Sequence, residues 1–373
     1  MTIGIDARML GSGYGIGRYI EQLVIHLELL DQHNQYVLFL RKDNWDAVTL
    51  KGGHMKKVLA DIPWYTAKEQ LFLPAIFKKE GVDLMHFPHW NVPMLYPGKF
   101  VVTIHDLTMF HYPRPEATTH GPIVYYVKDW MHRTVLARAT RRAAHIFVPS
   151  DFTKQDVHRT FAVSKEKITT TYLAPVPSVF AQDTGQDILV QYGITQPYVL
   201  YVGAAYPHKN VERLVRAWAL VRERSKEPCR LVLVGKESPF YARLEEKMRD
   251  RHLWNDVVYT GFVPDRHLPH VYAQASLFVF PSLYEGFGLP PLEAMVHGVP
   301  VVASSAACIP EIIGEAAVYV DPENIEQMAD AIHSVLRHDD IRSQLRENAQ
   351  QELRRYSWER LARQTIAVYD RFR

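Results

Sequence analysis

The stretch Leu277-Phe-Val-Phe-Pro-Ser-Leu-Tyr-Glu-Gly-Phe-Gly-Leu-Pro-Pro-Leu-Glu-Ala-Met295 contains the signals of a strand, a loop and a helix. Its first four residues are apolar and favour β structure, which is typical of a buried parallel strand. Glycines at 286 and 288 indicate a loop, and the prolines at 290 and 291 suit the first turn of a helix. The stretch therefore predicts one strand–loop–helix unit of an α/β fold.

The loop in this stretch predicts a binding site for a pyrophosphate group. The amides of Gly286, Phe287 and Gly288 precede a helix N-terminus, which carries a partial charge of about +0.5. Glu285 and Glu293 flank this site, so one carboxylate can face the sugar of a nucleotide sugar and the other its ribose. The alternatives are a solvated loop carboxylate for Glu285 and, for Glu293, a first-turn acid that stabilises the helix dipole.

Similar apolar strands recur on both sides of this stretch, separated by helical patterns. One series lies at 2–6, 36–40, 84–87, 101–105 and 146–149, and a second at 198–203, 230–235, 257–260, 277–280, 299–303 and 317–320. Alternating strands and helices predict two doubly wound α/β domains, whose strand ends face a cleft. We place the domains at 1–180 and 181–355, with turn residues at 173–195 as the linker and a helical end at 356–373.

Lys209 is the candidate cation of the second domain. It follows a predicted strand and a glycine turn in Tyr201-Val-Gly-Ala-Ala-Tyr-Pro-His-Lys-Asn210, where a helix begins. A lysine at this position can neutralise a diphosphate leaving group. The chain has no Asp-x-Asp pair to hold a divalent metal, so we expect neither a metal ion nor another cofactor.

Two features of the first domain are candidate ligand contacts. Glycines at 11, 13, 15 and 17 precede a helical pattern, which suits either an anion-binding loop or a plain tight turn. The pattern is not a clean dinucleotide fingerprint, because Ile16 stands where a third glycine is expected. His105 and Asp106 end another strand, where the imidazole can bind a hydroxyl and the carboxylate can fix its tautomer, although adjacent residues need not touch.

Composition and charge exclude several functional classes. The net charge of +2 divides into about +5 before residue 180 and −3 after it, far from the excess of a nucleic-acid binder. No apolar run approaches the ~20 residues of a membrane span, and we see no signal peptide. Two cysteines without a CxxC pattern favour a reducing, cytoplasmic setting. The basic helical segment around 128–142 suits either a solvated surface or peripheral contact with an anionic membrane.

With these motifs in place, the chain resembles the retaining glycosyltransferases of family 4, which have the GT-B fold. The resemblance rests on Glu285-Gly-Phe-Gly-Leu-Pro-Pro-Leu-Glu293, on Gly-Val-Pro-Val-Val-Ala-Ser, on Ile-Pro-Glu-Ile-Ile-Gly and on the N-terminal Ile-Asp-Ala-Arg and Gly-Ile-Gly-Arg-Tyr. It covers nearly the whole chain and is more specific in the second half. Taken together, these motifs resemble those of bacterial mannosyltransferases of surface polysaccharide and lipopolysaccharide assembly.

The resemblance implies a set of roles. Glu285 would contact the transferred sugar, Glu293 the ribose, and Lys209 with the 286–288 amides the diphosphate. His105 would lie near the transferred sugar, and the final helix would cross back to the first domain. The remaining donor contacts implied are Gly15, Gly17, Gly203, His208, Val263 and Leu289, and the acceptor contacts are Arg18 and Asp106. One departure is Ala204, because many relatives have Arg there, which leaves Lys209 helped by a protonated His208 or by Arg18.

These roles imply metal-independent transfer of a hexose, with retention, from a nucleotide sugar to a hydroxyl of a glycan or lipid-linked acceptor. GDP-mannose is the first expected donor and UDP-glucose the second. The expected location is cytoplasmic, with peripheral contact at the inner face of the plasma membrane as an option. The rivals are a nucleotide-sugar epimerase, a glycosyl phosphorylase and a non-catalytic nucleotide-sugar-binding subunit.

Overall fold

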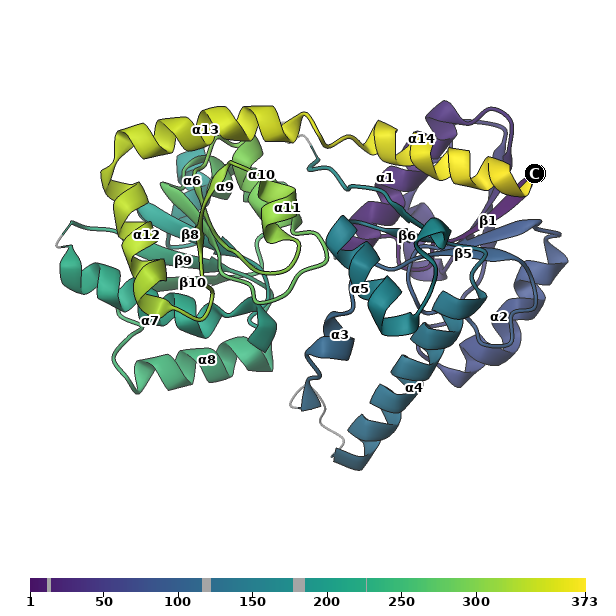
Figure 1. The fold of residues 1–373 in the computed structure, drawn as a ribbon, viewed down its shortest axis with the longest axis horizontal. Coiled ribbons are helices and arrows are strands. Elements are labelled where there is room, and N and C mark those ends of the chain that lie inside the picture. Colours follow the sequence, from purple (N-terminus) through teal and green to yellow (C-terminus); the bar gives the residue numbers. More distant parts are fainter. Residues whose placement is uncertain (12–14, 116–121, 177–184, 226) are drawn as a thin grey trace. The chain divides into compact units, whose positions relative to one another are not determined.

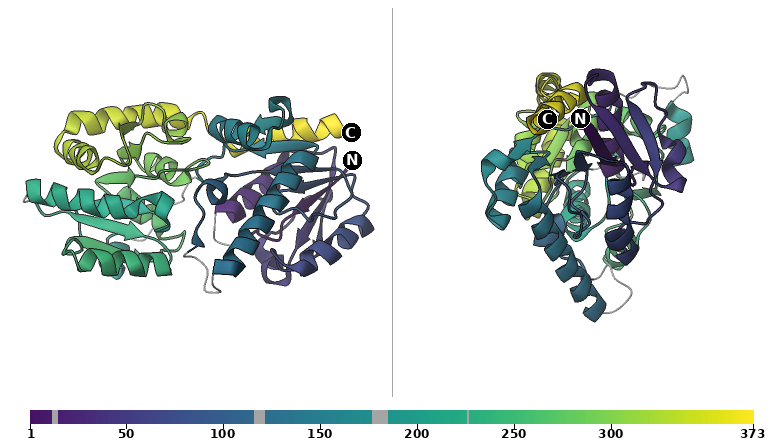
Figure 2. Two further views of the ribbon diagram at one scale, coloured as in Figure 1. Left: turned by 60° about the horizontal axis from the view of Figure 1, so that its bottom comes forward. Right: turned by 90° about the vertical axis from the view of Figure 1, so that its right-hand side faces the viewer.

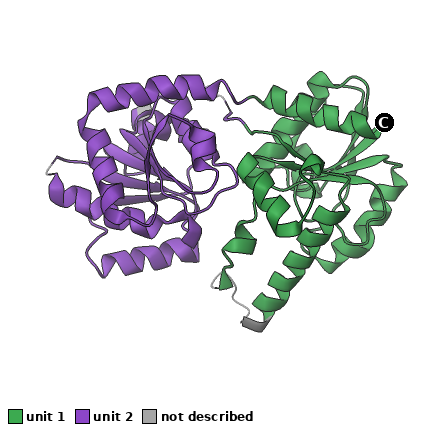
Figure 3. Ribbon diagram, viewed as in Figure 1, with its two compact units in different colours: residues 1–173, 357–373 green, residues 174–356 purple. Residues whose placement is uncertain are grey.

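The computed structural model describes residues 1–11, 15–115, 122–176, 185–225 and 227–373. The chain forms two compact units (Figure 3). Unit 1 comprises Met1–Leu173 together with Ser357–Arg373, and unit 2 comprises Ala174–Tyr356. Each unit contains one parallel sheet, so the two are described in turn.

Unit 1 is built on a seven-stranded sheet with the order β3-β2-β1-β4-β5-β6-β7. Figure 1 labels β1, β5 and β6 of this sheet. Every neighbouring pair in this sheet is parallel. Its strands are β1 (Thr2–Asp6), β2 (Gln35–Leu40), β3 (Met55–Leu59), β4 (Leu84–Phe87), β5 (Phe100–Thr103), β6 (His145–Val148) and β7 (Ile168–Thr170). Its helices are α1 (Gly15–Leu30), α2 (Ala67–Lys79), α3 (Thr108–His111), α4 (Pro122–Arg142), α5 (Asp151–Phe161) and α14 (Trp358–Tyr369), with short 3-10 turns η1 (Lys42–Ala47), η3 (Lys165–Lys167) and η5 (Asp370–Phe372).

Unit 2 is built on a six-stranded parallel sheet with the order β10-β9-β8-β11-β12-β13. Its strands are β8 (Tyr198–Val202), β9 (Arg230–Val234), β10 (Val257–Gly261), β11 (Leu277–Phe280), β12 (Val301–Ser304) and β13 (Ala317–Val320). Its helical elements are α6 (Gly185–Gln191), η4 (Pro207–Lys209), α7 (Val211–Arg224), α8 (Pro239–Arg249), α9 (Leu268–Ala273), α10 (Leu289–Val296), α11 (Ile309–Ile313), α12 (Ile325–Arg337) and α13 (Asp339–Leu353).

The predicted fold class, two doubly wound α/β domains, is confirmed. All six strands predicted for unit 2 occur, whereas two strands of unit 1, β3 and β7, escaped the sequence reading. These are the two edge strands of their sheet. β3 exposes Lys56 and β7 has only three residues, so neither shows the continuous apolar run of a central strand.

A buried hydrogen-bond network attaches α14 to the rest of unit 1, where the helix lies against α1 (Figure 1). His86 of β4 is completely buried, and its Nδ1 lies 2.6 Å from the hydroxyl oxygen of Tyr369. Its Nε2 lies 2.8 Å from Oγ1 of Thr103, which is 3.0 Å from the hydroxyl oxygen of Tyr19. These hydrogen bonds thus join β4, β5, α1 and α14, and each buried polar atom among them has a partner.

The buried imidazole of His86 predicts a loss of stability in acid. Burial lowers the pKa of His86 to about 3, against about 6.5 in the unfolded chain. Between these values the unfolded chain binds more protons, so the free energy of unfolding falls as the pH falls, by up to about 1.4 kcal/mol per pH unit from this group. In a His86→Gln variant, thermal unfolding midpoints measured at pH 7.0 and 5.5 should differ less than in the native chain. Equal differences in the two proteins would contradict this.

Candidate functional site

Both sheets have a point at which the strand order reverses. In unit 2, β8 lies between β9 and β11, and in unit 1, β1 lies between β2 and β4. In open α/β sheets, ligands bind outside the carboxyl ends of the strands at this switch point. The loops after β8 and β11, and those after β1 and β4, are therefore the places to look for a site.

An ion pair joins the two loops at the switch point of unit 2. Nζ of Lys209 lies 2.7 and 2.8 Å from the two carboxylate oxygens of Glu285. The Lys209 side chain is 23% exposed and that of Glu285 11%, so both groups keep contact with solvent. The structure thus brings together two predicted site residues that are 76 positions apart in sequence.

Hydrogen bonds from the backbone and from one buried side-chain amide hold these two loops together. Asn210, with φ 62°, is in the left-handed region, and its Nδ2 donates to the carbonyl oxygens of Pro281 (3.0 Å) and Pro322 (2.7 Å). The amide of Leu283 donates to the carbonyl oxygen of His208 at 2.7 Å, which ties the buried His208 to the Glu285 loop. Asn210 is a positioning residue that the sequence reading missed. An Asn just before a helix predicts an N-cap, but this side chain makes no cap hydrogen bond and instead reaches residues 71 and 112 positions away.

The glycine loop leads directly into α10, as predicted. Gly288 has φ 96°, and a Cβ at this position would lie 3.2 Å from the Phe280 ring, so both backbone and space favour glycine. Leu289 begins the helix, and the two prolines lie in its first turn. The carbonyl oxygen of the buried Phe287 accepts a hydrogen bond from Sγ of Cys308 at 3.2 Å. The loop therefore holds one conformation directly before the N-terminus of α10, which is the positive end of the helix dipole.

Glu293 is oriented by a tyrosine. It lies beyond the first turn of α10, which contains no acidic residue, so its interpretation as a first-turn acid on the helix dipole is wrong. Its Oε2 is 3.0 Å from the hydroxyl oxygen of Tyr272, whose ring stacks on His297 at 5.8 Å. Tyr272 is buried on α9 and was missed, because an aromatic residue in a helix reads as core from sequence.

Two further predicted donor contacts lie at strand ends of unit 2. Gly203 follows β8, where a Cβ would come within 2.7 Å of the Tyr201 hydroxyl oxygen. That hydroxyl donates to the carbonyl oxygen of Ala204 at 2.8 Å. Val263 follows β10 and is buried. The strand ends are thus closely packed around the loops that carry Lys209 and Glu285.

His105 is the predicted ligand contact at a strand end of unit 1. Its Nε2 donates to the carbonyl oxygen of Pro88 at 2.9 Å, and its ring packs edge-on against Tyr19 at 4.9 Å. Burial lowers its pKa, an effect that the Pro88 carbonyl and the Asp106 carboxylate oppose. The neutral ring therefore carries its proton on Nε2, which makes Nδ1 a hydrogen-bond acceptor.

Asp106 does not provide the tautomer-fixing bond that was considered for it. Its Oδ1 accepts from the backbone N–H of Thr108 at 2.7 Å, whereas the carbonyl oxygen of Pro88 sets the His105 tautomer. The sequence could not show this, because Pro88 is 17 residues away in the chain.

The N-terminal glycine loop is described in part, because residues 12–14 lie outside the described residues. Gly15 is the exposed first residue of α1, Gly17 is buried in it, and Arg18 is half-buried. Since Tyr19 follows directly and packs on His105, the start of α1 lies beside the His105 strand end. In the described part of the chain, no group of three or more His, Cys, Asp or Glu side chains is arranged to hold a metal ion.

Comparison with known proteins agrees with this architecture. Residues 14–174 match Glycosyltransferase Family 4, and residues 188–352 match Glycosyl transferases group 1. The O-antigen chain mannosyltransferase B of Escherichia coli is 31% identical over 95% of both chains. The O-antigen chain mannosyltransferase RfbU of Salmonella typhimurium is 27% identical over 74% of this chain and 73% of its own.

The fold is also that of solved enzymes. A sucrose-phosphate synthase from Thermosynechococcus elongatus superposes with a TM-score of 0.74 at 22% identity, covering 100% of this chain and 98% of that one. The whole-length sequence match, the two family matches and the two doubly wound units together show that the chain belongs to the family 4 glycosyltransferases.

Proposed function

We propose that the chain transfers a mannosyl group from GDP-mannose, with retention and without a metal ion, to a hydroxyl of a glycan or lipid-linked acceptor. The observation that carries the proposal is the Lys209–Glu285 pair at the switch point of unit 2, beside the N-terminus of α10. The O-antigen mannosyltransferases among its relatives support mannose as the sugar. UDP-glucose is the second donor considered.

In the proposed reaction, Lys209 and the N-terminus of α10 stabilise the departing diphosphate. The bond between the anomeric carbon and the diphosphate oxygen breaks, and its electron pair leaves with the phosphate. The acceptor oxygen bonds to the same face of that carbon, and its proton passes to the leaving phosphate oxygen. Lys209 and the N-terminus of α10 stabilise the negative charge that develops, as preorganised groups do in a site of low polarity.

The carboxylates take binding roles in this scheme. Glu285 accepts hydrogen bonds from hydroxyls of the transferred sugar, and Lys209 holds it in place from the neighbouring loop. Glu293, oriented by Tyr272, accepts hydrogen bonds from the ribose hydroxyls. In unit 1, Nδ1 of the neutral His105 accepts a hydrogen bond from a sugar hydroxyl. In this scheme no carboxylate acts as a nucleophile, whereas retaining glycoside hydrolases use one in that role.

An apolar and basic surface on unit 1 supports peripheral membrane contact. Four large apolar side chains of α4 are each at least half exposed and follow the spacing of one helix face: Tyr126, Val127, Trp130 and Met131. Exposed apolar side chains in such a group mark an interaction surface. We call these four residues the α4 patch. The helix projects from unit 1 in Figures 1 and 2.

Elements next to α4 expose further apolar side chains, and α4 itself carries positive charge. Nε of Arg138 donates to the carbonyl oxygen of Met94, and the amide of Met94 donates to Oε1 of Gln70, so α4, the β4–β5 loop and α2 are neighbours. Leu71, Phe72 and Leu95 on these neighbours are also more than half exposed. α4 itself has five basic residues and one acidic residue, and each basic residue near an anionic bilayer contributes about 1 kcal/mol. No described helix has the length and apolar character needed to cross a membrane.

Replacing Glu285 should abolish transfer without unfolding the chain. Glu285→Gln loses the charge that Lys209 and the sugar hydroxyls both bind, so we expect kcat for mannosyl transfer to fall at least ~100-fold. The thermal unfolding free energy should change by no more than ~1 kcal/mol, because Lys209 remains solvated. Radiolabelled transfer from GDP-mannose to a lipid-linked glycan measures the rate, and proton NMR of the product gives its anomeric configuration.

Glu323→Gln is the matched control, because Glu323 is 71% exposed and its ion pair with Arg213 is long, at 3.4 Å. Its transfer rate should equal that of the native chain. Full activity of Glu285→Gln, or a product of inverted configuration, would contradict the proposed function. Conversion of the donor into its epimer without acceptor would indicate an epimerase instead, and a requirement for phosphate would indicate a phosphorylase.

The α4 patch predicts binding to anionic vesicles. Val127→Ser combined with Trp130→Ser removes two exposed apolar anchors, so flotation with phosphatidylglycerol vesicles should fall at least ~10-fold. The control is Leu29→Ser combined with Val190→Ser, because Leu29 and Val190 are 68% and 72% exposed and lie elsewhere. Equal flotation of both double variants would contradict the assignment of this surface.

A further inference from the structure

Lys209 ends a loop that begins directly after β8, and the conformation of this loop decides where the amine lies. We call residues 203–209 the β8 loop. Its last three residues form η4, in which the amide of Lys209 donates to the carbonyl oxygen of Tyr206 at 2.8 Å. The residues before η4, 203–206, are neither helix nor strand. Contacts from outside the loop must therefore fix this part, because it has no hydrogen-bond ladder of its own.

Two tyrosine hydroxyls bind consecutive carbonyl groups at the start of the β8 loop. Tyr201, in β8, donates to the carbonyl oxygen of Ala204 at 2.8 Å. Tyr241, in α8, donates to the carbonyl oxygen of Gly203, also at 2.8 Å. Both tyrosines are buried. A buried carbonyl that loses its partner costs about 1–3 kcal/mol, so the two hydrogen bonds favour one conformation of the loop.

Both tyrosines keep their protons and therefore act as donors. Burial raises the pKa of Tyr201 and that of Tyr241 above the usual value of about 10. The neighbouring Tyr241 and Glu285 raise the pKa of Tyr201 further. A carbonyl oxygen only accepts, so a protonated phenol is the partner that it needs. The effect of Glu285 on Tyr201 also shows that this ring lies near the carboxylate that pairs with Lys209.

The start of α8 contacts the β8 loop at a second point. Phe240 precedes Tyr241 in α8, and its ring packs edge-on against Tyr206, with ring centroids 5.1 Å apart. Tyr206 in turn stacks on the buried His208 at 6.0 Å, directly before Lys209. Two adjacent residues of α8 therefore support both the beginning and the end of the loop that carries the cation.

Tyr241 is itself held by the neighbouring strands β9 and β10. Its ring stacks on that of Tyr259 in β10, with centroids 4.4 Å apart. The Tyr259 hydroxyl donates to the carbonyl oxygen of Gly235, which follows β9, at 3.1 Å. A Cβ on Gly235 would lie 2.2 Å from the carbonyl oxygen of Gly203 and 2.8 Å from the Tyr241 hydroxyl oxygen. Glycine at position 235 therefore leaves the space that the Tyr241–Gly203 hydrogen bond occupies.

We propose that Tyr201 and Tyr241 are positioning residues of the transfer reaction, which hold the β8 loop so that the Lys209 amine meets the diphosphate. Both hydroxyls are bonded to backbone carbonyls, so neither is assigned a contact with the substrate. A misplacement of about 1 Å in a site can cost about 100-fold in rate, so a support outside the site matters to catalysis. The inference rests on the proposed function and deepens it by naming what places its cation.

A double-mutant cycle with Lys209 tests the proposal. GDP and UDP are titrated into the full chain by calorimetry in EDTA, and the cycle uses the nucleotide that binds more tightly. Tyr241→Phe removes the hydroxyl and keeps the ring, so the Kd should rise about fivefold, and Tyr201→Phe should have the same effect. In the Lys209→Met background, Tyr241→Phe should change the Kd by less than about twofold, because the tyrosine acts only through Lys209.

Tyr319→Phe is the matched control, because the Tyr319 hydroxyl also donates to a glycine carbonyl, that of Gly314, at 2.6 Å. Tyr319 lies in the edge strand β13, which is separated from β8 by β11 and β12. This variant reports the purely structural cost of such a bond, and its Kd should equal the native value. In the transfer assay, Tyr241→Phe should lower kcat about tenfold and leave the acceptor KM unchanged, a split that general destabilisation does not produce.

Several results would overturn the positioning role. They are a native Kd in both tyrosine variants, a rise that persists in the Lys209→Met background, an equal rise in Tyr319→Phe, and no binding of either nucleotide by the native chain. If Tyr241→Phe does not fold, Tyr201→Phe completes the same cycle. Failure of the proposed function would be seen separately, as absent transfer from GDP-mannose by the native chain while the nucleotide titrations keep the pattern above.

Discussion

The parallel order of the strands in each sheet is the constraint on which the sites depend. Because β8 pairs with both β9 and β11, the loops that leave β8 and β11 must begin side by side, although 76 residues separate Lys209 from Glu285. The same arrangement of β1 between β2 and β4 places Asp6 and Arg8 beside the loop that carries His89 and Asn91. The fold thus creates two switch points, one in each unit.

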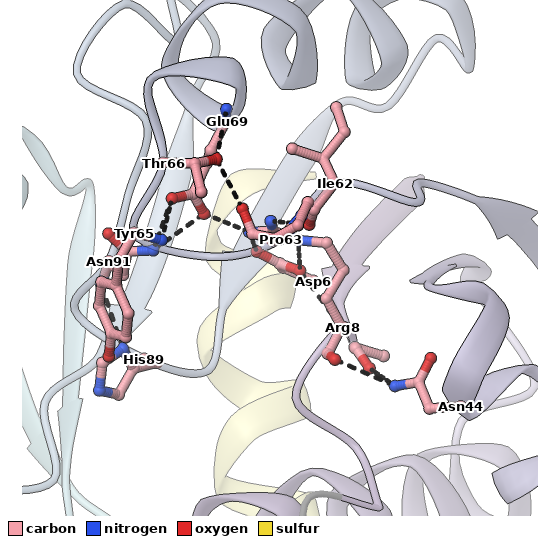
Figure 4. A network of polar contacts seen from close by, with 11 residues as sticks. Asp6, Arg8, Asn44, Ile62, Pro63, Tyr65, Thr66, Glu69, His89 and Asn91 are labelled. Carbon is pink, nitrogen blue, oxygen red and sulfur yellow. Dashed lines mark hydrogen bonds and ion pairs between the residues drawn. The ribbon is translucent and has the colours of Figure 1, made fainter.

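The basic residues at the two switch points differ in exposure. In unit 2, the Lys209 side chain is 23% exposed and pairs with Glu285 beside the N-terminus of α10. In unit 1, the Arg8 side chain is 2% exposed and pairs with both Asp6 and Glu69 (Figure 4). Of these two cations, only Lys209 is open to solvent.

Sequence reasoning recovered the parts that depend on local pattern. Buried central strands are recognisable in the sequence as apolar runs. The glycine loop before α10 was predicted together with the prolines of its first turn. It missed β3 and β7, because an edge strand that exposes Lys56, or a strand of only three residues, has no such pattern. It also missed the partnership of Arg8 with Glu69 and of Asn210 with Pro281 and Pro322. These contacts span 61, 71 and 112 positions and exist only once the sheets have formed.

The most direct test of the central claim is calorimetric titration of GDP and GDP-mannose in EDTA, with UDP and UDP-glucose in parallel, into the native chain and Lys209→Met. If Lys209 and the α10 loop hold the diphosphate without a metal ion, the native chain binds one of the two pairs in EDTA. The variant then binds that nucleotide diphosphate at least ~10-fold more weakly, as expected for a lost charge-assisted hydrogen bond, while its affinity for the free nucleoside is unchanged. Binding that requires a divalent cation, or equal affinity of both proteins for the diphosphate, would contradict the account.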